Sequence, residues 1–269
     1  MKGRICICPL ASGSSGNAVL VTAGGAKILV DCGLTGKVIC QRLEEAGVRP
    51  EELDALIVTH EHTDHISGVG IIGRKFGIPV FATIGTWKQM IKQIGKIDPD
   101  QIRYIASDVP FKIKDAVINP VKTSHDASES IGLVFSNHGK SGGIFTDLGT
   151  VDKHIFDMLL DCSVLLIEAN HDEKMLAAGA YPRHLKQRIT SDIGHLSNRV
   201  CGAFCARLAR EGKVREITLA HLSKENNTPD LAYAAVSASI EAVGKIIGED
   251  VRLMVADPSF VGEKMVDED

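Results

Sequence analysis

A stretch of seven residues constrains this chain most, because residues 59–65 read Thr-His-Glu-His-Thr-Asp-His. The stretch follows residues 53–58, a short apolar and β-branched run with the pattern of a buried strand. An amphipathic helix is predicted to begin at Ile66 and to end at Gly77. Since a loop between two rigid elements can hold side chains in a fixed arrangement, we expect a functional site here.

Four side chains of this stretch are common metal ligands, namely His60, His62, Asp64 and His65. In an extended loop alternate residues point the same way, so His60 and His62 can face one ion. Asp64 and His65 follow about one turn later and point elsewhere, which suits a second ion. A solvated His-rich loop is the alternative, and the position directly after a strand disfavours it.

The composition is that of a globular protein, because 44% of the 269 residues are hydrophobic and 24% are charged. No linker divides the chain, so we expect a single domain over residues 1–262 and a solvated, frayed acidic tail over residues 263–269. The start lacks an apolar signal segment, and no run approaches the roughly 18 apolar residues of a membrane span. We therefore expect a cytoplasmic protein without a membrane partner. Nothing in the sequence specifies an oligomeric state.

The seven cysteines are an odd number in a chain without a predicted export signal, which predicts reduced thiols. Cys6 and Cys8, like Cys201 and Cys205, have the spacing of metal-binding pairs. Their neighbours are apolar and no matching histidine pair is nearby, which favours buried thiols. The net charge of -4 does not favour a large nucleic-acid footprint, although a local basic face is compatible with it.

Ligand-type side chains also follow predicted strands elsewhere in the chain. In chain order they are Asp31, His125, Asp147, Glu168 and His221. Helical periodicity between the strands predicts two halves, each with strands followed by helices. We expect the ligand types to gather at one edge of the sheets.

These residues resemble the motifs of the metallo-β-lactamase-fold superfamily: H-x-H-x-D-H after a strand, an earlier Asp at a strand end, and a distant His, Asp and His. The resemblance implies an α/β (α+β) fold, an αββα four-layer sandwich with two mixed β-sheets. It implies two divalent metal ions, zinc or manganese, the first held by His60, His62 and His125, the second by Asp64, His65 and His221, and both bridged by Asp147. Asp31 would orient ligands without binding an ion.

Within the superfamily, four stretches resemble the YycJ-like (WalJ-like) nuclease branch: residues 12–17, 168–172, 181–189 and 194–198. Members of that branch are described as nucleases acting on DNA. The resemblance implies a 5′-to-3′ DNA exonuclease that uses a metal-bridging hydroxide as nucleophile, with Asp64 in the catalytic centre. Only about seventy residues separate Asp147 from His221. That is too few for the large clamp domain of the related ribonuclease J, because a domain typically needs about 100 or more.

Two divalent ions carry four positive charges, of which Asp64, Asp147 and a hydroxide would cancel three. The remaining positive charge suits a phosphodiester and its more anionic transition state. Metal binding also lowers the pKa of water towards about 7, so no strong base is needed to form hydroxide.

Several side chains outside the ligand set are candidates for catalysis or substrate binding. His171 and His195 lie in loops with hydrogen-bonding neighbours, where a histidine can contact phosphate or protonate a leaving group; buried structural histidines are the alternative. Glu168 could orient either histidine or be an ordinary acidic residue at a strand end. The Ser-Gly turn at residues 12–17 fits an anion-binding nest or an ordinary hairpin turn. The candidate substrate-binding residues are Ser12, Ser14, Asn17, Asn170, Arg183, Lys186, Ser197 and Asn198.

The function favoured by these features is metal-dependent phosphodiester hydrolysis, with DNA as the substrate. A glyoxalase II-like thioester hydrolase or a small cyclic-phosphate phosphodiesterase could use the same seven ligands. A catalytically silent nucleic-acid-binding protein is disfavoured by the complete ligand set, and 1 Trp and 3 Tyr are few for stacking bare single strands. A β-lactamase is disfavoured because Asp147 stands where many of those enzymes have Cys. A flavin-linked di-iron oxygen reductase would have Glu at position 62.

Overall fold

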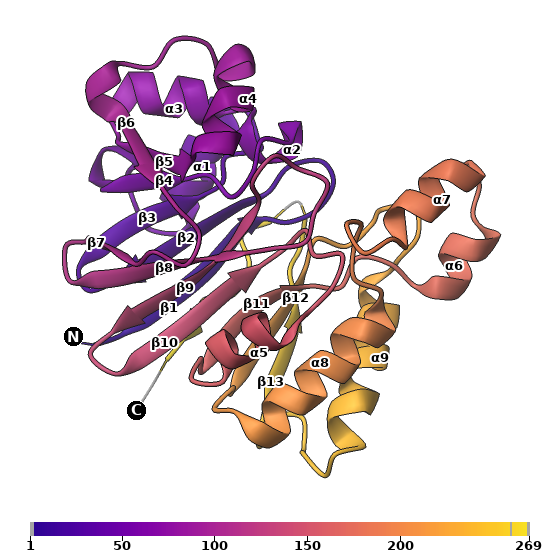
Figure 1. Ribbon diagram of the computed structural model, residues 1–269. Coiled ribbons are helices and arrows are strands. Elements are labelled where there is room, and N and C mark those ends of the chain that lie inside the picture. Colours follow the sequence, from indigo (N-terminus) through magenta and orange to yellow (C-terminus); the bar gives the residue numbers. More distant parts are fainter. Residues whose placement is uncertain (1–2, 259, 268–269) are drawn as a thin grey trace.

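The computed structural model of the chain describes residues 3–258 and 260–267 (Figure 1). These residues form two mixed β-sheets of seven strands each. Across the first sheet the strands are, in order, β14 (Met265–Val266), β1 (Ile5–Ala11), β2 (Ala18–Ala23), β3 (Ala26–Val30), β4 (Ala55–Ile57), β5 (Val80–Thr83) and β6 (Ile102–Ile105). Across the second they are β13 (Arg252–Val255), β12 (Glu216–Ala220), β11 (Val164–Glu168), β10 (Lys140–Phe145), β9 (Ile131–Asn137), β8 (Ala116–Lys122) and β7 (Phe111–Ile113).

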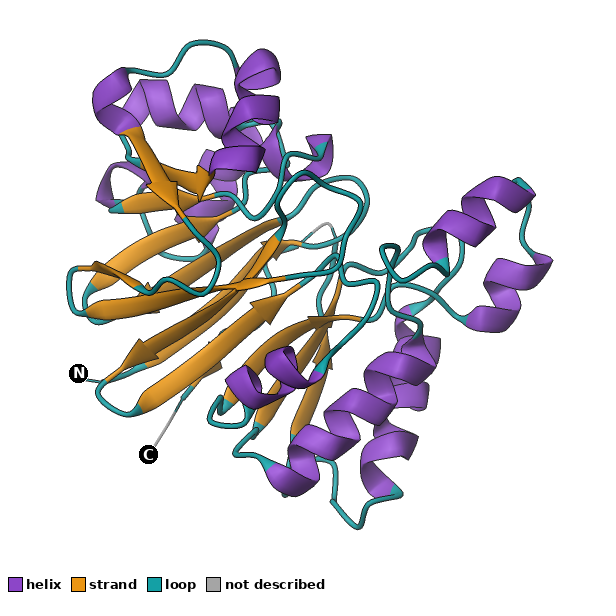
Figure 2. Ribbon diagram, viewed as in Figure 1, coloured by secondary structure: helices purple, strands orange, loops and turns teal. Residues whose placement is uncertain are grey.

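Helices cover the outer face of each sheet (Figures 1 and 2). The first sheet carries α1 (Gly36–Glu45), α3 (Val69–Phe76) and α4 (Ile84–Ile94), and the second carries α5 (Lys153–Leu159), α8 (Asn198–Glu211) and α9 (Pro229–Glu241). Two helices, α6 (Glu173–Ala178) and α7 (Arg183–Ile189), stand apart from the sheets in Figure 1. The short elements are α2 (Thr63–Ile66), η1 (Pro50–Glu52) and η2 (Pro99–Gln101). The arrangement is the predicted αββα sandwich.

Successive side chains along each strand point to opposite faces of the sheet, and this alternation produces the layers. In β11, Val164 and Leu166 pack between the two sheets, while Leu165 and Ile167 pack against the helices of the second sheet. Three apolar clusters result, one between the sheets and one under each helical layer. A strand buried on both faces has little room for polar residues until it ends, so the polar side chains concentrate at strand ends.

Each sheet is antiparallel on one side and parallel on the other. The first sheet is antiparallel from β14 to β3 and parallel from β3 to β6. The second is antiparallel from β7 to β10 and parallel from β10 to β13. Neighbouring parallel strands end at the same edge, which collects the residues that follow them.

The predicted start of the helix at Ile66 is wrong. Thr63 to Ile66 form α2, and α3 begins only at Val69. The apolar periodicity missed α2 because Asp64 and His65 face the site and add nothing to an apolar stripe. The predicted end is confirmed, since Gly77 follows α3 with a left-handed φ of 66°.

The expected frayed tail over residues 263–269 is also partly wrong. Met265–Val266 pair with β1 as a strand, with Met265 opposite Ile7. Met265 is fully buried between the sheets, and burial of such a side chain stabilises the fold by about 1.5–3 kcal/mol, enough to order its acidic neighbours. Residues 268–269 lie outside the described residues.

All seven cysteines are free thiols, as predicted. The Sγ atoms of Cys201 and Cys205 lie 3.9 Å apart inside the cluster under α8. Within residues 3–258 and 260–267, no helix combines the length and apolar character that crossing a membrane requires.

Candidate metal centre

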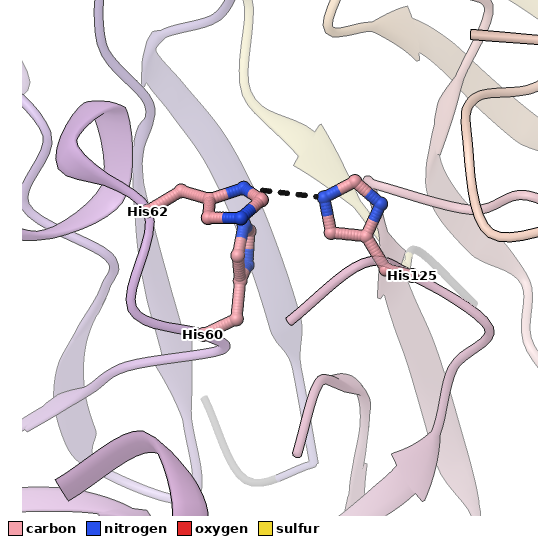
Figure 3. A group of neighbouring side chains, drawn as sticks. All are labelled: His60, His62 and His125. Carbon is pink, nitrogen blue, oxygen red and sulfur yellow. Dashed lines mark hydrogen bonds between the residues drawn. The ribbon is translucent and has the colours of Figure 1, made fainter. Parts of the chain in front are cut away.

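Three histidines from two strand ends form one part of the site (Figure 3). His60 and His62 follow β4 of the first sheet, and His125 follows β8 of the second. One ring nitrogen of each lies within 4.8 Å of the others, and His125 Nε2 lies 3.3 Å from His62 Nδ1. Two nitrogens bound at about 2.1 Å to one tetrahedral ion would lie about 3.4 Å apart. The three imidazoles are thus close to the arrangement that a single ion needs.

A second group of three ligand types lies beside the first. Asp64 and His65 come from α2, and His221 follows β12. One donor atom of each lies within 4.8 Å of the others. Asp64 Oδ2 is 3.6 Å from both His65 Nε2 and His221 Nε2. This group can hold another ion.

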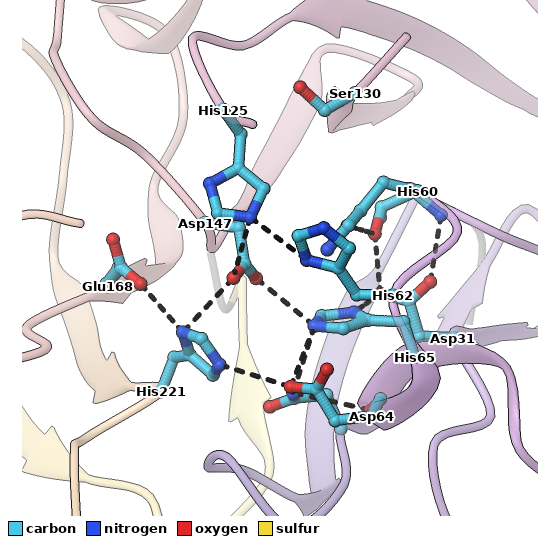
Figure 4. A network of polar contacts seen from close by, with 12 residues as sticks. Asp31, His60, His62, Asp64, His65, His125, Ser130, Asp147, Glu168 and His221 are labelled. Atoms are coloured by element: carbon cyan, nitrogen blue, oxygen red, sulfur yellow. Dashed lines mark hydrogen bonds and ion pairs between the residues drawn. The ribbon is translucent and has the colours of Figure 1, made fainter. Parts of the chain in front are cut away.

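Asp147 lies between the two groups (Figure 4). Its Oδ2 is 3.2 Å from His65 Nε2, and its Oδ1 is 3.6 Å from His125 Nε2. The carboxylate therefore reaches one member of each group. A carboxylate in this position can bind two ions, one through each oxygen.

Three strand-end residues of the site have an uncommon backbone conformation. The φ angles of Asp31, Asp147 and His221 are 57°, 58° and 55°, in the left-handed region that few residues other than glycine adopt. The cost is roughly 1–2 kcal/mol per residue for an ordinary L-amino acid. Asp and His tolerate this region better than most residues. Such strain concentrates at functional sites, because only surrounding contacts can maintain it.

Asp31 fixes the orientation of two histidines. Its Oδ1 accepts a hydrogen bond from the Thr59 backbone N–H, and its Oδ2 accepts from the Thr59 hydroxyl and from His65 Nδ1, each at 2.8 Å. Because the Thr59 hydroxyl donates to Asp31, it must accept from His60 Nδ1 at 3.0 Å. His60 and His65 then carry a proton on Nδ1 and present Nε2 as a ligand. The contacts support the orienting role that the resemblance implied for Asp31.

Glu168 is fully buried and holds two more histidines. Its Oε1 accepts from His195 Nδ1 at 2.8 Å and from His221 Nδ1 at 2.7 Å, and its Oε2 accepts from the backbone N–H groups of Leu148 and Leu196. Burial alone would raise the pKa of Glu168, but the charges and hydrogen bonds of His195 and His221 lower it to about 2. Glu168 is therefore ionised and positions both histidines.

The residues at this edge fit divalent metal ions. Among the described residues, His60 Nε2, His221 Nε2 and Asp147 Oδ2 are buried atoms without a hydrogen-bond partner. An unsatisfied buried polar atom costs about 1–3 kcal/mol, and a bound cation removes that cost. Burial would lower the pKa of His221, yet the carboxylates of Asp147, Asp64 and Glu168 raise it well above its usual value. The raised pKa of His221 indicates an excess of negative charge around it, and this charge attracts cations.

A cavity of about 240 Å³ opens onto this cluster, and we call it the central cavity. Predicted metal-binding or catalytic residues in its wall are His62, Asp64, Asp147, His195 and His221. Of the predicted substrate-binding residues, Ser14 and Asn170 line it. Asn170 also donates to the His221 carbonyl at 2.9 Å.

Ser12 and Asn17 support the ligands instead of facing the central cavity. Ser12 Oγ accepts from the His221 backbone N–H at 2.7 Å, and Asn17 Nδ2 lies 3.2 Å from Asp64 Oδ2 and 3.0 Å from His65 Nε2. The backbone N–H groups of residues 13, 16 and 17 are bonded within the protein, and the anion-nest hypothesis for this turn stays a prediction.

Gly33 allows this turn to pack against the helix that carries two ligands. Asn17 N–H donates to the Asp64 carbonyl, and Gly33 N–H donates to the Asn17 carbonyl, both at 2.8 Å. A Cβ atom on Gly33 would lie 1.7 Å from the Asp64 carbonyl oxygen. Only glycine fits this approach.

Three residues predicted to act on substrate, His171, Ser197 and Asn198, form contacts that hold loops together. Ser197 is the N-cap of α8 and accepts from Val200 N–H at 3.3 Å, and Asn198 pairs with Asn227 at 2.8 Å. The His171 carbonyl accepts from Asn198 N–H, and the His171 side chain is 2% exposed. None of the three lines the central cavity. The isolated bridge between His171 and Ser197 packs their loops together, while the substrate-binding role of Ser197 and Asn198 and the catalytic role of His171 stay predictions.

The basic side chains of α7 point in different directions relative to the central cavity. Arg183 is exposed, and Lys186 Nζ donates to the Ala177 carbonyl at 2.7 Å; neither lines the central cavity. Arg188 lines the central cavity, and its guanidinium pairs with the carboxylate of Asp126. It lies two residues after Lys186, about 200° further around a helix, which explains why it faces the opposite side. The helical period of this basic run was the signal that could have singled out Arg188.

Comparison with known proteins agrees with this architecture. The sequence profile of the metallo-β-lactamase superfamily matches residues 11–148. The metallo-β-lactamase fold protein YhfI from Bacillus subtilis superposes with a TM-score of 0.70 at 18% identity, over 98% of this chain and 100% of that chain. Zn²⁺-bound PqqB from Methylobacterium extorquens superposes with a TM-score of 0.71 at 15% identity, over 97% and 99%. This chain belongs to the metallo-β-lactamase superfamily, whose fold and His/Asp clusters fit divalent metal binding.

Relatives of higher identity define its branch. Exodeoxyribonuclease WalJ of Streptococcus pneumoniae serotype 2 is 39% identical over 251 residues, which are 93% of this chain and 93% of that protein. Exodeoxyribonuclease YycJ of Bacillus anthracis is 36% identical over 252 residues, which are 93% of this chain and 95% of that protein. The chain is thus a member of the WalJ and YycJ branch, which confirms the predicted branch.

Proposed function

We propose that this chain is a metal-dependent exodeoxyribonuclease that removes nucleotides from the 5′ end of DNA. The observation that carries the proposal is the arrangement around Asp147, with three ligand side chains on each side of it and His195 at the same cavity. Two relatives that span nearly the whole chain bear the name exodeoxyribonuclease. A site of this kind suits an anionic phosphodiester.

In this proposal the site holds two ions, zinc or manganese, and its ligands are His60, His62, His125, Asp147, Asp64, His65 and His221. Such ions supply Lewis acidity toward phosphoryl oxygens and lower the pKa of a water molecule towards about 7. Asp31 and Glu168 keep the histidine protons on Nδ1, so that Nε2 remains available.

His195 is the residue that we propose to act on the leaving group. Its Nδ1 donates to Glu168, which leaves Nε2 for the central cavity. Burial would lower the pKa of His195, but Glu168 raises it above its usual value. The imidazole therefore keeps its proton to a higher pH than an ordinary histidine and can donate it to a leaving alkoxide.

A panel of substrates tests the proposed function. End-labelled single- and double-stranded DNA and RNA, a thioester and a cyclic nucleotide would each be incubated with the protein and with zinc or manganese. We expect mononucleotides as the first products, released from the 5′ end of DNA. Hydrolysis of the thioester or the cyclic nucleotide alone would favour the alternative hydrolases.

We predict that His195→Ala keeps its metal content but cleaves DNA on the order of 100-fold more slowly, the usual contribution of a general acid. A phosphodiester with a nitrophenol leaving group needs little protonation, so its hydrolysis should fall far less. The measurement is kcat/KM on both substrates, with the exposed His154→Ala as control. If DNA and the nitrophenyl ester were equally unaffected, His195 would have no role in proton donation.

We predict that Arg188→Ala weakens DNA binding and lowers the slope of log K against log salt by about one, because one cation leaves the path of the phosphates. The double variant Arg183→Ala with Lys186→Ala should also reduce the slope if α7 lies along the DNA. Binding at a series of salt concentrations measures this. The control is Arg210→Ala, an exposed cation at the end of α8. A slope equal to the unmodified protein's in both α7 variants would exclude α7 from the DNA contact.

A further inference from the structure

Two more cavities share wall residues with the central cavity, and the two do not share the same ones. The first, which we call the Tyr181 pocket, has a volume of about 580 Å³ and shares Ser14, Tyr181 and Ser223 with the central cavity. The second, which we call the α4 groove, has a volume of about 480 Å³ and shares His62, Asp64 and Arg188 with it. A strand that crosses the candidate metal centre would therefore leave one of these spaces and enter the other.

The two spaces differ in chemistry. All the described residues that line the α4 groove are polar or charged, and Gln89 and Gln93 of α4 are among them. The Tyr181 pocket combines an aromatic ring with apolar walls such as Leu222 and Pro258, and with the polar and charged groups of Ser14, Lys224 and Glu225. Its volume lies within the roughly 300–1,000 Å³ typical of small-ligand pockets. The groove suits a solvated backbone, whereas the Tyr181 pocket suits a base with its sugar and phosphate.

Tyr181 is placed to contact such a base. It lies between α6 and α7, the two helices that stand apart from the sheets (Figure 1). Its side chain is half-buried and belongs to the walls of both the Tyr181 pocket and the central cavity. The pocket is also lined by Thr228 and Pro229 at the start of α9 and by Ala256. This boundary limits how much of a strand can enter.

We propose that the Tyr181 pocket binds the terminal nucleotide of the DNA strand, with its base stacked on Tyr181, while the rest of the strand runs along the α4 groove. This proposal rests on the proposed exonuclease function. In hydrolysis from the 5′ end, the oxygen of water joins the phosphorus, which remains on the shortened strand as its new 5′-phosphate. The bond from phosphorus to the 3′-oxygen of the terminal nucleotide breaks, and that oxygen leaves with its electron pair and takes up a proton. Occupancy by one nucleotide would make mononucleotides the products.

The test compares two DNA substrates that differ only in whether the terminal nucleotide carries a base. Stacking of a base on an aromatic side chain changes affinity by about 5- to 150-fold. We expect the unmodified protein to cleave the normal end faster than the abasic end by a factor in this range of kcat/KM. In Tyr181→Ala that ratio should fall close to one, and Tyr181→Phe should restore it. Tyr104→Ala removes a tyrosine that is 64% exposed on β6 and should leave both rates unchanged.

The outcomes separate the two proposals. If the protein cleaves DNA but the ratio is near one before any substitution, the stacking pocket is excluded while the exonuclease proposal stands. An unaltered ratio in Tyr181→Ala would likewise exclude Tyr181. If neither DNA end is cleaved while a thioester or a cyclic nucleotide is hydrolysed, the proposed function itself fails. The abasic comparison needs no variant, so it remains decisive even if Tyr181→Ala does not fold.

Discussion

Asp147→Asn is expected to lower phosphodiester hydrolysis on the order of 1,000-fold or more, because removal of the bridging charge takes several kcal/mol of transition-state stabilisation from the site. Each Asp147 oxygen approaches a histidine of a different ligand group. The variant should therefore lose one or both metal ions together with its activity. Metal content per chain and hydrolysis of a nitrophenyl phosphodiester measure the two effects.

Asparagine is the informative substitution because Asp147 has a φ of 58°, a conformation that Asn tolerates well and Ala does not. Asp147→Ala should lose metal too, but with added backbone strain. Asp108 provides the matched control, since its φ is 61° and its side chain pairs with the exposed His154. Asp108→Asn and Asp108→Ala should keep full metal content and activity. Full metal content and activity in Asp147→Asn would falsify the bridging role.

The second large effect is expected for Glu168→Gln. Each Glu168 oxygen accepts two hydrogen bonds, so a buried amide must turn its NH₂ group toward two donors. Unsatisfied buried donors cost about 1–3 kcal/mol each, and the variant should lose about 2–4 kcal/mol of folding free energy. If the NH₂ group faces His195 and His221, their Nδ1 atoms must accept and their protons move to Nε2. Nε2 of His221 would then lack the lone pair that binds a metal ion, and His195 would lose its orientation. Activity should therefore fall at least about 100-fold.

Glu173→Gln is the control for this substitution. Glu173 is exposed on α6 and pairs with Arg199, an ion pair of a kind worth about 0–1 kcal/mol. Denaturant unfolding and kcat/KM should both stay close to those of the unmodified protein. Equal, small changes in Glu168→Gln and Glu173→Gln would show that Glu168 does not position the histidines.

The candidate metal ligands could be located from sequence because most of them follow a buried strand, and Asp64 and His65 lie in the short helix α2 after β4. An apolar run such as residues 53–58 marks the strand, and the first polar residues after it must lie at the sheet edge. His60 follows β4 of the first sheet and His221 follows β12 of the second, so the packing of the two sheets brings them together although they are 161 positions apart in the sequence. The layers of the sandwich could be predicted for a related reason, since the alternation of side chains along a strand indicates which faces of the sheet are buried.

The roles of other polar residues could not be predicted, because their partners come from distant segments. Ser12 bonds to His221, and Asn198 bonds to Asn227. The sequence shows that these residues can form hydrogen bonds, but not whether the partner is the protein or a substrate. Tyr181 carries no local signal of a cavity, which forms only when α7 packs near the central site.

The central claim is that phosphodiester hydrolysis requires two metal ions in the groups joined by Asp147. Its most direct test is to titrate metal-depleted protein with manganese or zinc while metal bound per chain and mononucleotide release from DNA are measured together. We predict that release stays low at one ion per chain and rises to its maximum as the second ion binds. Maximal release at one ion per chain, or undiminished release without metal, would contradict a dinuclear centre.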